Sequence, residues 1–498
     1  MRNRSFIFFI FFTALTLSSC KKWLDLKPQD GVVRQEFWKT KEQVHSAVIG
    51  CYASLLAPKT SSANYSLAEL LFMWGELRAD MIAVTQTADI NQSDVVSVNT
   101  VSTNPITNWM LLYRTINYCN TVIDFAPAVI NEDPTFNQAQ LDAYLAEAYG
   151  LRSLMYFYLV RSFGDVPLKL KSTSSDSEIE QLPKNTKEEV LNQIVKDLEI
   201  AERGAVTTYG NRASDKGRFT KYTINALQAD VYLWMEKYNE CITACDKIIN
   251  SGNFGLIAGN SAWFNTLYYN GNSNEGIFEF QFDQQILNPF YNMFIAGARD
   301  FVAQPRVMEE MYMIDFLNDQ NKDIRGDGAA VRITDNAIWK LVAFDFNTAR
   351  SAAESYAHWF VYRYADVLLM KAEALAYTNR GEEALAIVQT IRDRAHAIDA
   401  TAENPDTTDP NAVGDYILAE RAREFSFEGK RWYDILRFSK KNNYERISLL
   451  LNMVAKTVPG DRQQTAINIY KDFNSHYFPI YFYELQTNKT LVQNPFYQ

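Results

Sequence analysis

The chain has 498 residues and a formal net charge of −10, from 49 Lys and Arg against 59 Asp and Glu. Hydrophobic residues make up 47% and charged residues 22%, which is typical of a globular protein and excludes a largely disordered chain. The acidic balance excludes a fold-wide basic surface, so we expect no nucleic-acid partner. Aromatic residues reach 14%, a share high enough to require a structural or binding role.

The first 20 residues have the pattern of an export signal that ends at a lipid attachment site. Arg2 and Arg4 precede an apolar stretch over 6–17, about 12 residues, whereas a helix that spans a bilayer needs about 20. The sequence Leu-Ser-Ser-Cys that follows resembles a bacterial lipobox. We therefore predict a lipoprotein signal peptide at 1–19 and acylation of Cys20, palmitate included, which would anchor the mature chain to membrane lipid. The alternative is a plain signal peptide with an incidental cysteine.

Most of the mature chain has the period of helices. The stretches 42–56, 109–123 and 141–163 repeat apolar residues every three or four positions and predict helices. Gly164 and Pro167 supply the stop signal for the third. Four cysteines beyond Cys20 could pair in an exported chain, but we expect small buried residues in helix packing, and their disulfide state stays open.

Two later stretches have the spacing of tetratricopeptide helix pairs. Residues 223–250 and 364–395 place small residues at fixed offsets, which lets paired helices approach closely. Between them, 251–345 carries Gly, Asn and aromatic residues without a helical period for much of its length. We predict a mainly α fold in which 20–498 form a single domain and 251–345 are a loop-rich insertion that forms the ligand-binding region.

Five segments carry recognisable motifs: Trp-Leu-Asp-Leu-Lys-Pro at 23–28, the stretch from Glu147 to Leu168, Tyr362 to Ala374, Glu420 to Asp434, and Phe478 with the C-terminal 493–497. Together and in this order they resemble the RagB/SusD family of outer-membrane nutrient-binding lipoproteins. Departures from the family pattern are Lys430, where His is frequent, Tyr481, where a second Pro is common, and Phe496 in place of Gly before the final Tyr. They affect local packing more than family membership.

The resemblance implies a SusD-like fold with tetratricopeptide-like helix pairs and an irregular ligand-binding region. It also implies a partner, a SusC-like TonB-dependent outer-membrane transporter that the lipoprotein caps like a lid. The ligand that it implies is a nutrient, most often an oligosaccharide. On this interpretation the protein is anchored by lipid at the outer face of the outer membrane and is not an enzyme. A scaffold of tetratricopeptide type that binds only protein is the alternative.

Aromatic side chains outside the helical motifs are the candidates for ligand binding. The C–H faces of a sugar ring lie flat on Trp or Tyr, while its hydroxyls need planar polar partners. For each aromatic residue, packing in the core remains an equal alternative. The candidate residues are Trp74, Asp80, Trp263, Tyr268, Tyr269, Tyr291, Asn292 and Arg325.

Three glutamates leave a catalytic alternative open. Glu420, Glu424 and Glu428 are each four residues apart and share one helix face, with arginines between them. They could supply the acid–base pair of a secreted glycoside hydrolase, or an ion-pair network that ties helices together. We favour the network and predict no catalytic residues. The scattered histidines and the lack of a phosphate-binding loop predict no metal and no cofactor.

Overall fold

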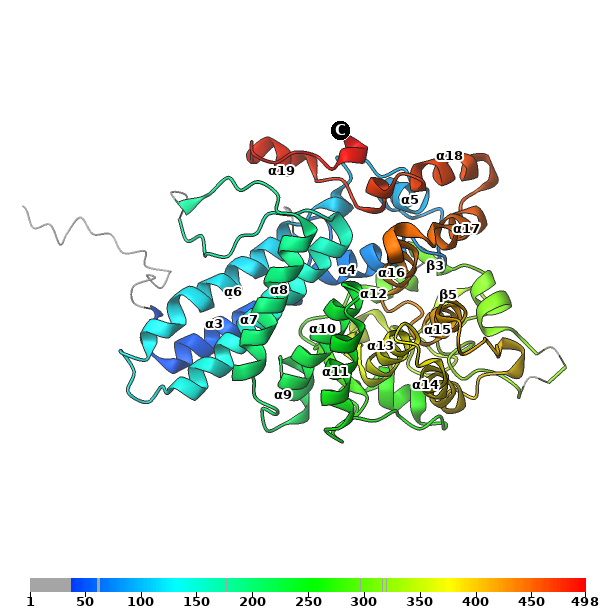
Figure 1. The fold of residues 1–498 in the computed structure, drawn as a ribbon, viewed down its shortest axis with the longest axis horizontal. Coiled ribbons are helices and arrows are strands. Elements are labelled where there is room, and N and C mark those ends of the chain that lie inside the picture. Colours follow the sequence, from blue (N-terminus) through cyan, green and yellow to red (C-terminus); the bar gives the residue numbers. More distant parts are fainter. Residues whose placement is uncertain (1–36, 61–62, 176–177, 296, 316, 319) are drawn as a thin grey trace, which may run out of the picture.

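The computed structural model describes residues 37–498 except 61–62, 176–177, 296, 316 and 319 (Figure 1). The predicted signal peptide and Cys20 lie outside the described residues. The fold is mainly α-helical, as predicted, with only short strands. Among the described residues, none of the helices has both the length and the apolar character needed to cross a membrane.

The N-terminal half is a layer of long helices on one side of the molecule (Figure 1). Thr40, Asn137 and Thr186 begin three of them, because each side chain accepts a hydrogen bond from a free amide of the first turn. Gly164, with φ of +73°, ends α7 where the sequence predicts it. The helix α7 packs against α3, α6 and α8. The bounds are α3 Lys41–Leu55, α4 Leu67–Glu76, α5 Ile90–Val96, α6 Met110–Val129, α7 Gln138–Phe163, α8 Lys187–Gly204 and α9 Arg212–Gly217.

Both predicted tetratricopeptide-like stretches form helix pairs. The first pair is α10 (Lys221–Trp234) with α11 (Tyr238–Ile249), and the second is α13 (Tyr364–Ala376) with α14 (Gly381–Arg394). Helix α11 also packs on α13, so the two pairs stack although more than a hundred residues separate them in the chain. Their small residues are fully buried at the contacts, which is what the spacing predicts.

The C-terminal helices cover the helix pairs and run along one edge of the molecule (Figure 1). Helix α16 packs on α4 from the N-terminal half, and α17 and α18 follow it in turn. The two ends of the chain are therefore parts of one core. The bounds are α15 Pro410–Glu424, α16 Arg431–Tyr444, α17 Ile447–Thr457, α18 Gly460–Tyr470 and α19 Phe482–Thr487.

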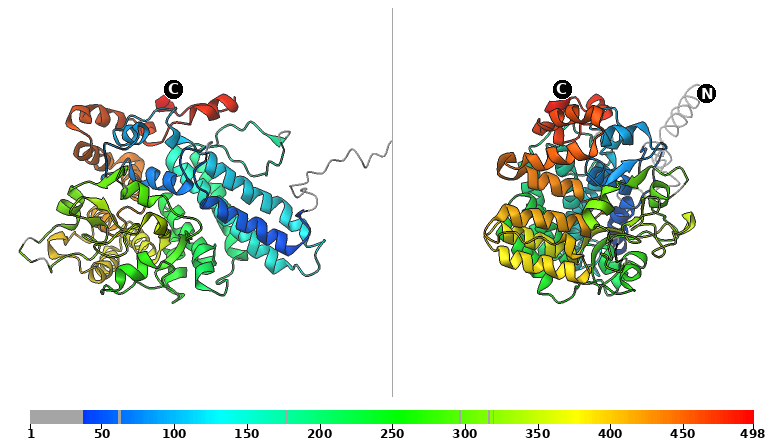
Figure 2. Two further views of the ribbon diagram at one scale, coloured as in Figure 1. Left: turned by 180° about the vertical axis from the view of Figure 1, so that it is seen from behind. Right: turned by 90° about the vertical axis from the view of Figure 1, so that its right-hand side faces the viewer.

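The region 251–345 lies on the opposite side of the molecule from α13 to α15 (Figure 2, right). Its short strands pair antiparallel, and two of the three pairings reach outside the region: β1 with β3, and β2 with β6. The irregular region is thus joined to the scaffold by backbone hydrogen bonds. The strands are β1 Ile82–Val84, β2 Gly276–Phe280, β3 Phe301–Ala303, β4 Val331–Arg332, β5 Ala337–Ile338 and β6 Trp359–Arg363, and α12 spans Phe290–Phe294.

Single-turn elements complete the described chain. Two of them are π-helical and lie in the 251–345 region, and the others have 3₁₀ geometry. They are η2 Pro105–Thr107, η4 Asn265–Tyr269, η5 Val307–Tyr312, η6 Ala352–Glu354, η7 Asp399–Thr401, η8 Phe473–His476 and η9 Pro495–Tyr497.

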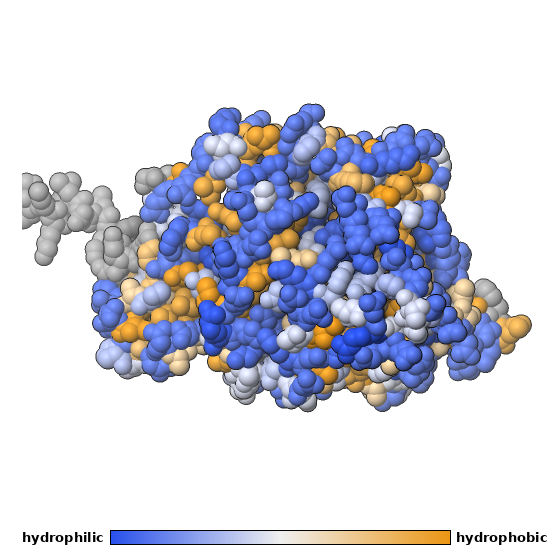
Figure 3. Space-filling view, in the orientation of Figure 1, coloured by the Kyte–Doolittle hydropathy of each residue, from blue (hydrophilic) through white to orange (hydrophobic). Residues whose placement is uncertain are grey.

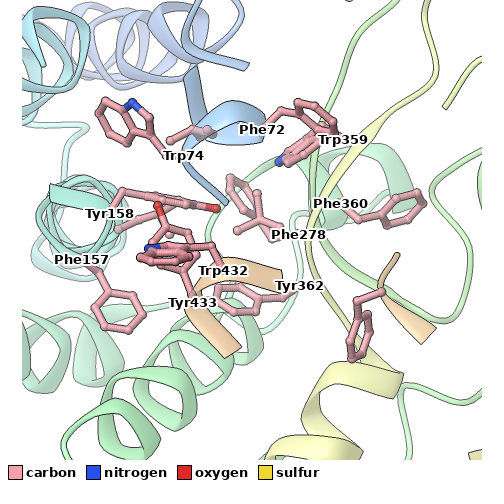
Figure 4. Close-up of a cluster of buried hydrophobic side chains, with 14 of the residues drawn as sticks. Phe72, Trp74, Phe157, Tyr158, Phe278, Trp359, Phe360, Tyr362, Trp432 and Tyr433 are labelled. Atoms are coloured by element: carbon pink, nitrogen blue, oxygen red, sulfur yellow. The ribbon is translucent and has the colours of Figure 1, made fainter. Parts of the chain in front are cut away.

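Aromatic side chains fill the core where α4, α7, β2, β6 and α16 meet (Figure 4). Trp74 lies at this junction, and its ring centroid is 5.1 Å from that of Phe163 in an edge-to-face arrangement. The indole Nε1 of Trp74 donates to the carbonyl of Ile106 at 2.7 Å. Trp359 and Trp432 are fully buried in the same cluster. Many of the aromatic residues of this protein are therefore packed in its core.

The cysteines of the described chain are structural. Cys51, Cys119, Cys241 and Cys245 are free and buried. This agrees with their predicted role as small residues between packed helices.

Candidate functional site

Five of the eight predicted ligand-binding residues are buried. Trp74, Asp80, Trp263, Tyr268 and Arg325 have between 0% and 4% of their surface exposed. A ring enclosed on both faces by protein offers no face to a sugar. The burial of these five residues favours core packing, the alternative that the sequence left open for the aromatic ones, over contact with a ligand.

Asp80 is the partner of an arginine. Its two carboxylate oxygens accept from Nε and Nη2 of Arg431 at 2.8 and 3.0 Å. Burial alone would raise the pKa of the Asp80 carboxyl, but Arg431 outweighs it and the pKa is lowered overall. The pair fixes the start of α16 to the loop after α4, which is a structural role.

Arg325 is held by three carboxylates. Its guanidinium donates to Asp323, at 2.6 Å from Nη2, to Glu420 at 2.7 Å and to Glu424 at 2.8 Å, both from Nη1. All four side chains are buried. The guanidinium donors are therefore engaged within the protein, and Arg325 ties the 251–345 region to α15.

A second arginine continues the same network. Arg363, at the end of β6, bonds Glu275 at 2.7 Å, Glu424 at 2.6 Å and Glu428 at 3.0 Å, and is fully buried. Lys340 also reaches Glu428, at 3.0 Å. The hydroxyl of the predicted ligand residue Tyr268 donates to this same glutamate at 3.3 Å.

The three glutamates of α15 and the following turn act as structural anions. Burial would raise the pKa of Glu420, Glu424 and Glu428, but the surrounding arginines and, for Glu428, also Lys340 lower each pKa overall. A general acid in glycoside cleavage needs a raised pKa and access to substrate. The favoured prediction of an ion-pair network is confirmed.

An exposed group of aromatic side chains does occur where the 251–345 region meets the following loop. We call the rings of Tyr269, Phe344, Phe346 and Tyr356, together with Arg350, the aromatic surface, although Arg350 itself has only 3% of its surface exposed. Phe344 and Phe346 have 45% and 41% of their surface exposed. The ring of Tyr269 meets that of Phe344 edge to face, with 4.9 Å between centroids. These are the apolar faces that a bound sugar ring requires.

Arg350 holds the aromatic surface together. Its guanidinium carbon lies 4.2 Å from the ring centroid of Tyr269 and 5.0 Å from that of Tyr356. Nη2 donates to the carbonyl of Tyr269 at 2.6 Å, and Nη1 to that of Glu354 at 3.3 Å. Within the described part of the chain, Nε of Arg350 has no hydrogen-bond partner, and the acceptors of the other two nitrogens are these backbone carbonyls.

Tyr291, in α12, is joined by its backbone to the loop that carries Tyr356, and Asn292 follows it in the chain. The amide of Tyr291 donates to the hydroxyl of Ser355 at 3.3 Å, one residue before Tyr356. Tyr291 is half-buried and Asn292 is exposed. Of the predicted residues, Tyr269 therefore belongs to the aromatic surface, and the backbone of Tyr291 contacts the loop that carries Tyr356.

Sequence reasoning missed four of the five members of the aromatic surface, three of them aromatic and the fourth Arg350. Phe344 lies in a polar stretch at the end of the 251–345 region, and Phe346, Arg350 and Tyr356 lie just beyond it. Aromatic residues set among Asp, Asn and Thr, without helical or strand period, were the available signal.

Most of the molecular face drawn in Figure 3 is hydrophilic, with hydrophobic residues scattered over it.

Comparison with known proteins places the chain in a family. Residues 234–497 match the family model described as the SusD family, and residues 22–233 match the one described as starch-binding associating with outer membrane. The chain belongs to the SusD family. The resemblance expected from five sequence segments is confirmed.

Relatives within the SusD family cover nearly the whole chain. SusD-like protein P38 of Formosa agariphila is 26% identical over 487 residues, which is 88% of this chain and 92% of that protein. SusD-like protein P2 of the same organism is 26% identical over 470 residues, or 86% and 89% of the two chains.

Solved structures share the fold. A SusD superfamily protein from Bacteroides vulgatus has a TM-score of 0.77 at 21% identity, and the match covers 92% of this chain and 100% of that one. NanU of B. fragilis has a TM-score of 0.67 at 23% identity, covering 95% and 100%. The predicted SusD-like fold class is confirmed.

Membership of the SusD family gives the general activity. Proteins of this family bind glycans or other nutrients, are generally non-catalytic, and work with SusC-like transporters. The family description associates them with the outer membrane.

Proposed function

We propose that this SusD-family protein is a lipid-anchored lipoprotein on the cell surface that captures an oligosaccharide and hands it to a TonB-dependent outer-membrane transporter. No bond of the ligand is made or broken. The observation that supports capture is the aromatic surface, where the exposed Phe344 and the half-buried Tyr269 lie beside the guanidinium of Arg350.

The aromatic surface has the chemistry that a sugar ring needs. Phe344 and Tyr269 offer ring faces for the C–H face of a sugar, and exposed Asn292 supplies an amide for its hydroxyls. Arg350 is pinned by two backbone carbonyls, so its position is fixed before a ligand arrives. A preorganised binding surface loses less conformational entropy when the ligand binds.

Replacing Tyr269 by alanine is expected to weaken oligosaccharide binding by about tenfold or more, which is ~1.4 kcal/mol. The substitution removes one ring from the surface and the edge-to-face partner of Phe344. Calorimetric titration of the full chain in detergent against a glycan panel measures the change. Tyr483→Ala is the matched control, because Tyr483 is an exposed tyrosine of α19 outside the surface. Equal losses in the two variants would contradict the proposal.

The anchor and the transporter partner are tested in cells. Replacing Cys20 by alanine is expected to abolish palmitate labelling and to release the protein from the outer-membrane fraction, because no acyl chain can then attach. Cys119→Ala, which removes a buried free cysteine, keeps the label. The wild-type protein is expected to co-purify with a TonB-dependent transporter from detergent extracts. Labelled Cys20→Ala protein, or a wild-type preparation without the transporter, would refute the corresponding part of the proposal.

A further inference from the structure

A polar cavity of about 530 Å³ lies beside α9 and the start of α10, and none of its residues belongs to the aromatic surface. Cavities of this volume hold small organic ligands. The lining combines cationic, amide, hydroxyl and aromatic side chains. The lining residues are Thr207, Thr208, Gly210, Asn211, Arg212, Asp215, Lys216, Thr220, Tyr222, Asn253, Phe254 and Asn274.

Lys216 is the unusual member of this lining. It has 7% of its surface exposed, and its Nζ lies 4.3 Å from the ring centroid of Phe254. Among the described residues its ammonium makes no hydrogen bond and no ion pair. A buried lysine is normally paired, because desolvating an unpaired charge is costly. Burial lowers the pKa of Lys216 to about 8.

The charged groups around Lys216 do not neutralise it at close range. They are Glu279, Arg212 and Asp215. Glu279 accepts from Nδ1 of His358 at 2.7 Å and from a backbone amide at 2.8 Å, while its other oxygen has no partner and lies beyond ion-pair distance of Nζ. Asp215 accepts from the Thr208 hydroxyl at 2.8 Å. Arg212 adds a second positive charge to the lining.

The rest of the lining suits a sugar ring. Tyr222 and Phe254 meet edge to face with 5.2 Å between centroids. The amide of Asn253 donates to the hydroxyl of Tyr222 at 2.7 Å, and Asn211, Asn253 and Asn274 are exposed. Amides of this kind pair with hydroxyls, and the aromatic rings offer apolar faces.

We propose that this cavity is a second binding site, for an acidic saccharide whose carboxylate or sulfate pairs with Lys216. The anion supplies the partner that the ammonium of this largely buried lysine lacks, and Arg212 adds attraction. Phe254 and Tyr222 contact the sugar, and the amides at the exposed side receive its hydroxyls. The inference goes beyond capture at the aromatic surface, because the two sites share no residue.

The test is calorimetric titration of the full chain in detergent with three probes: a galacturonic acid trimer, its fully methyl-esterified form, and a sulfated galactose trimer. We expect at least one anionic trimer to bind and the esterified trimer to bind at least tenfold more weakly. Lys216→Met is expected to lower the affinity for the anionic trimer by tenfold or more. The carboxylate and sulfate probes distinguish the two sources of the charge.

Two further variants keep the test decisive. Lys221→Met removes the same charge five residues away, from a side chain that does not line the cavity, and is expected to bind normally. Tyr222→Phe removes only a rim hydroxyl and is expected to weaken binding while the fold is kept, which covers the case in which Lys216→Met is unstable. The proposal is overturned if neither anionic trimer binds, if the esterified trimer binds equally well, or if folded Lys216→Met binds like the wild type. If Lys216→Met is unstable, wild-type binding by Tyr222→Phe overturns it.

Discussion

Replacing Arg363 by methionine is expected to lower the free energy of unfolding by ~3–5 kcal/mol, the usual cost of removing one partner from a buried ion pair. The guanidinium of Arg363 is fully buried and bonds Glu275, Glu424 and Glu428. Its loss leaves these carboxylates in a site with little water and less positive charge. The pKa of Glu424, now lowered by Arg394 and Arg363 against the effect of burial, would rise.

Urea unfolding followed by circular dichroism measures the loss of stability at Arg363. The matched control is Arg380→Met, since Arg380 pairs with Glu383 on an exposed part of α14. Exposed pairs contribute little, so this variant should unfold at nearly the wild-type urea concentration. If the two variants had the same midpoint, the network would not have the structural role described here.

Replacing Trp74 by alanine is expected to cost ~3–5 kcal/mol of stability, as is typical when a large core side chain is truncated. The substitution opens a cavity between α4 and the rings of Phe163 and Phe478, and leaves the carbonyl of Ile106 without its donor. Trp74→Phe keeps most of the volume and should cost less. Glycan affinity of the folded fraction should stay unchanged, because the indole is fully buried.

Thermal unfolding and titration of Trp74→Ala at low temperature separate stability from binding. A lowered melting temperature with wild-type affinity is the expected pair of results. A variant of unchanged stability that no longer binds glycan would show that Trp74 contacts ligand after all.

The helical scaffold was predictable because its signals are local. These signals are the 3.6-residue period, the capping residues and the small residues at fixed offsets. Each of them lies within a single helix or within two consecutive helices. The strand pairings could not be found in this way. Residues 82–84 pair with 301–303, and the sequence of neither segment indicates that the other is its partner.

The candidate site was predicted only in part, because burial depends on distant partners. Asp80 pairs with Arg431, 351 residues away, and Arg325 with Glu420, 95 residues away. Trp74 lies in α4, where nine of ten residues are buried, so the helix shows no polar face from which exposure could be judged. Tyr269 and its neighbour Tyr268 point to surface and core respectively, a difference that composition alone does not reveal.

The pairing of β2 with β6 constrains how this protein could acquire a new ligand. The partner of Gly276 in that pairing is Arg363, the same arginine that anchors the buried network. If the whole of 251–345 were replaced by the corresponding region of a relative, its strands would have to pair with β1 and β6 of this protein. The new region would also have to supply the side chains that complete the buried ion-pair network. Variation confined to the exposed loops, such as the one that carries Phe344 and Phe346, avoids both demands. Specificity in this scaffold should therefore diverge by single substitutions at loop tips rather than by recombination of blocks.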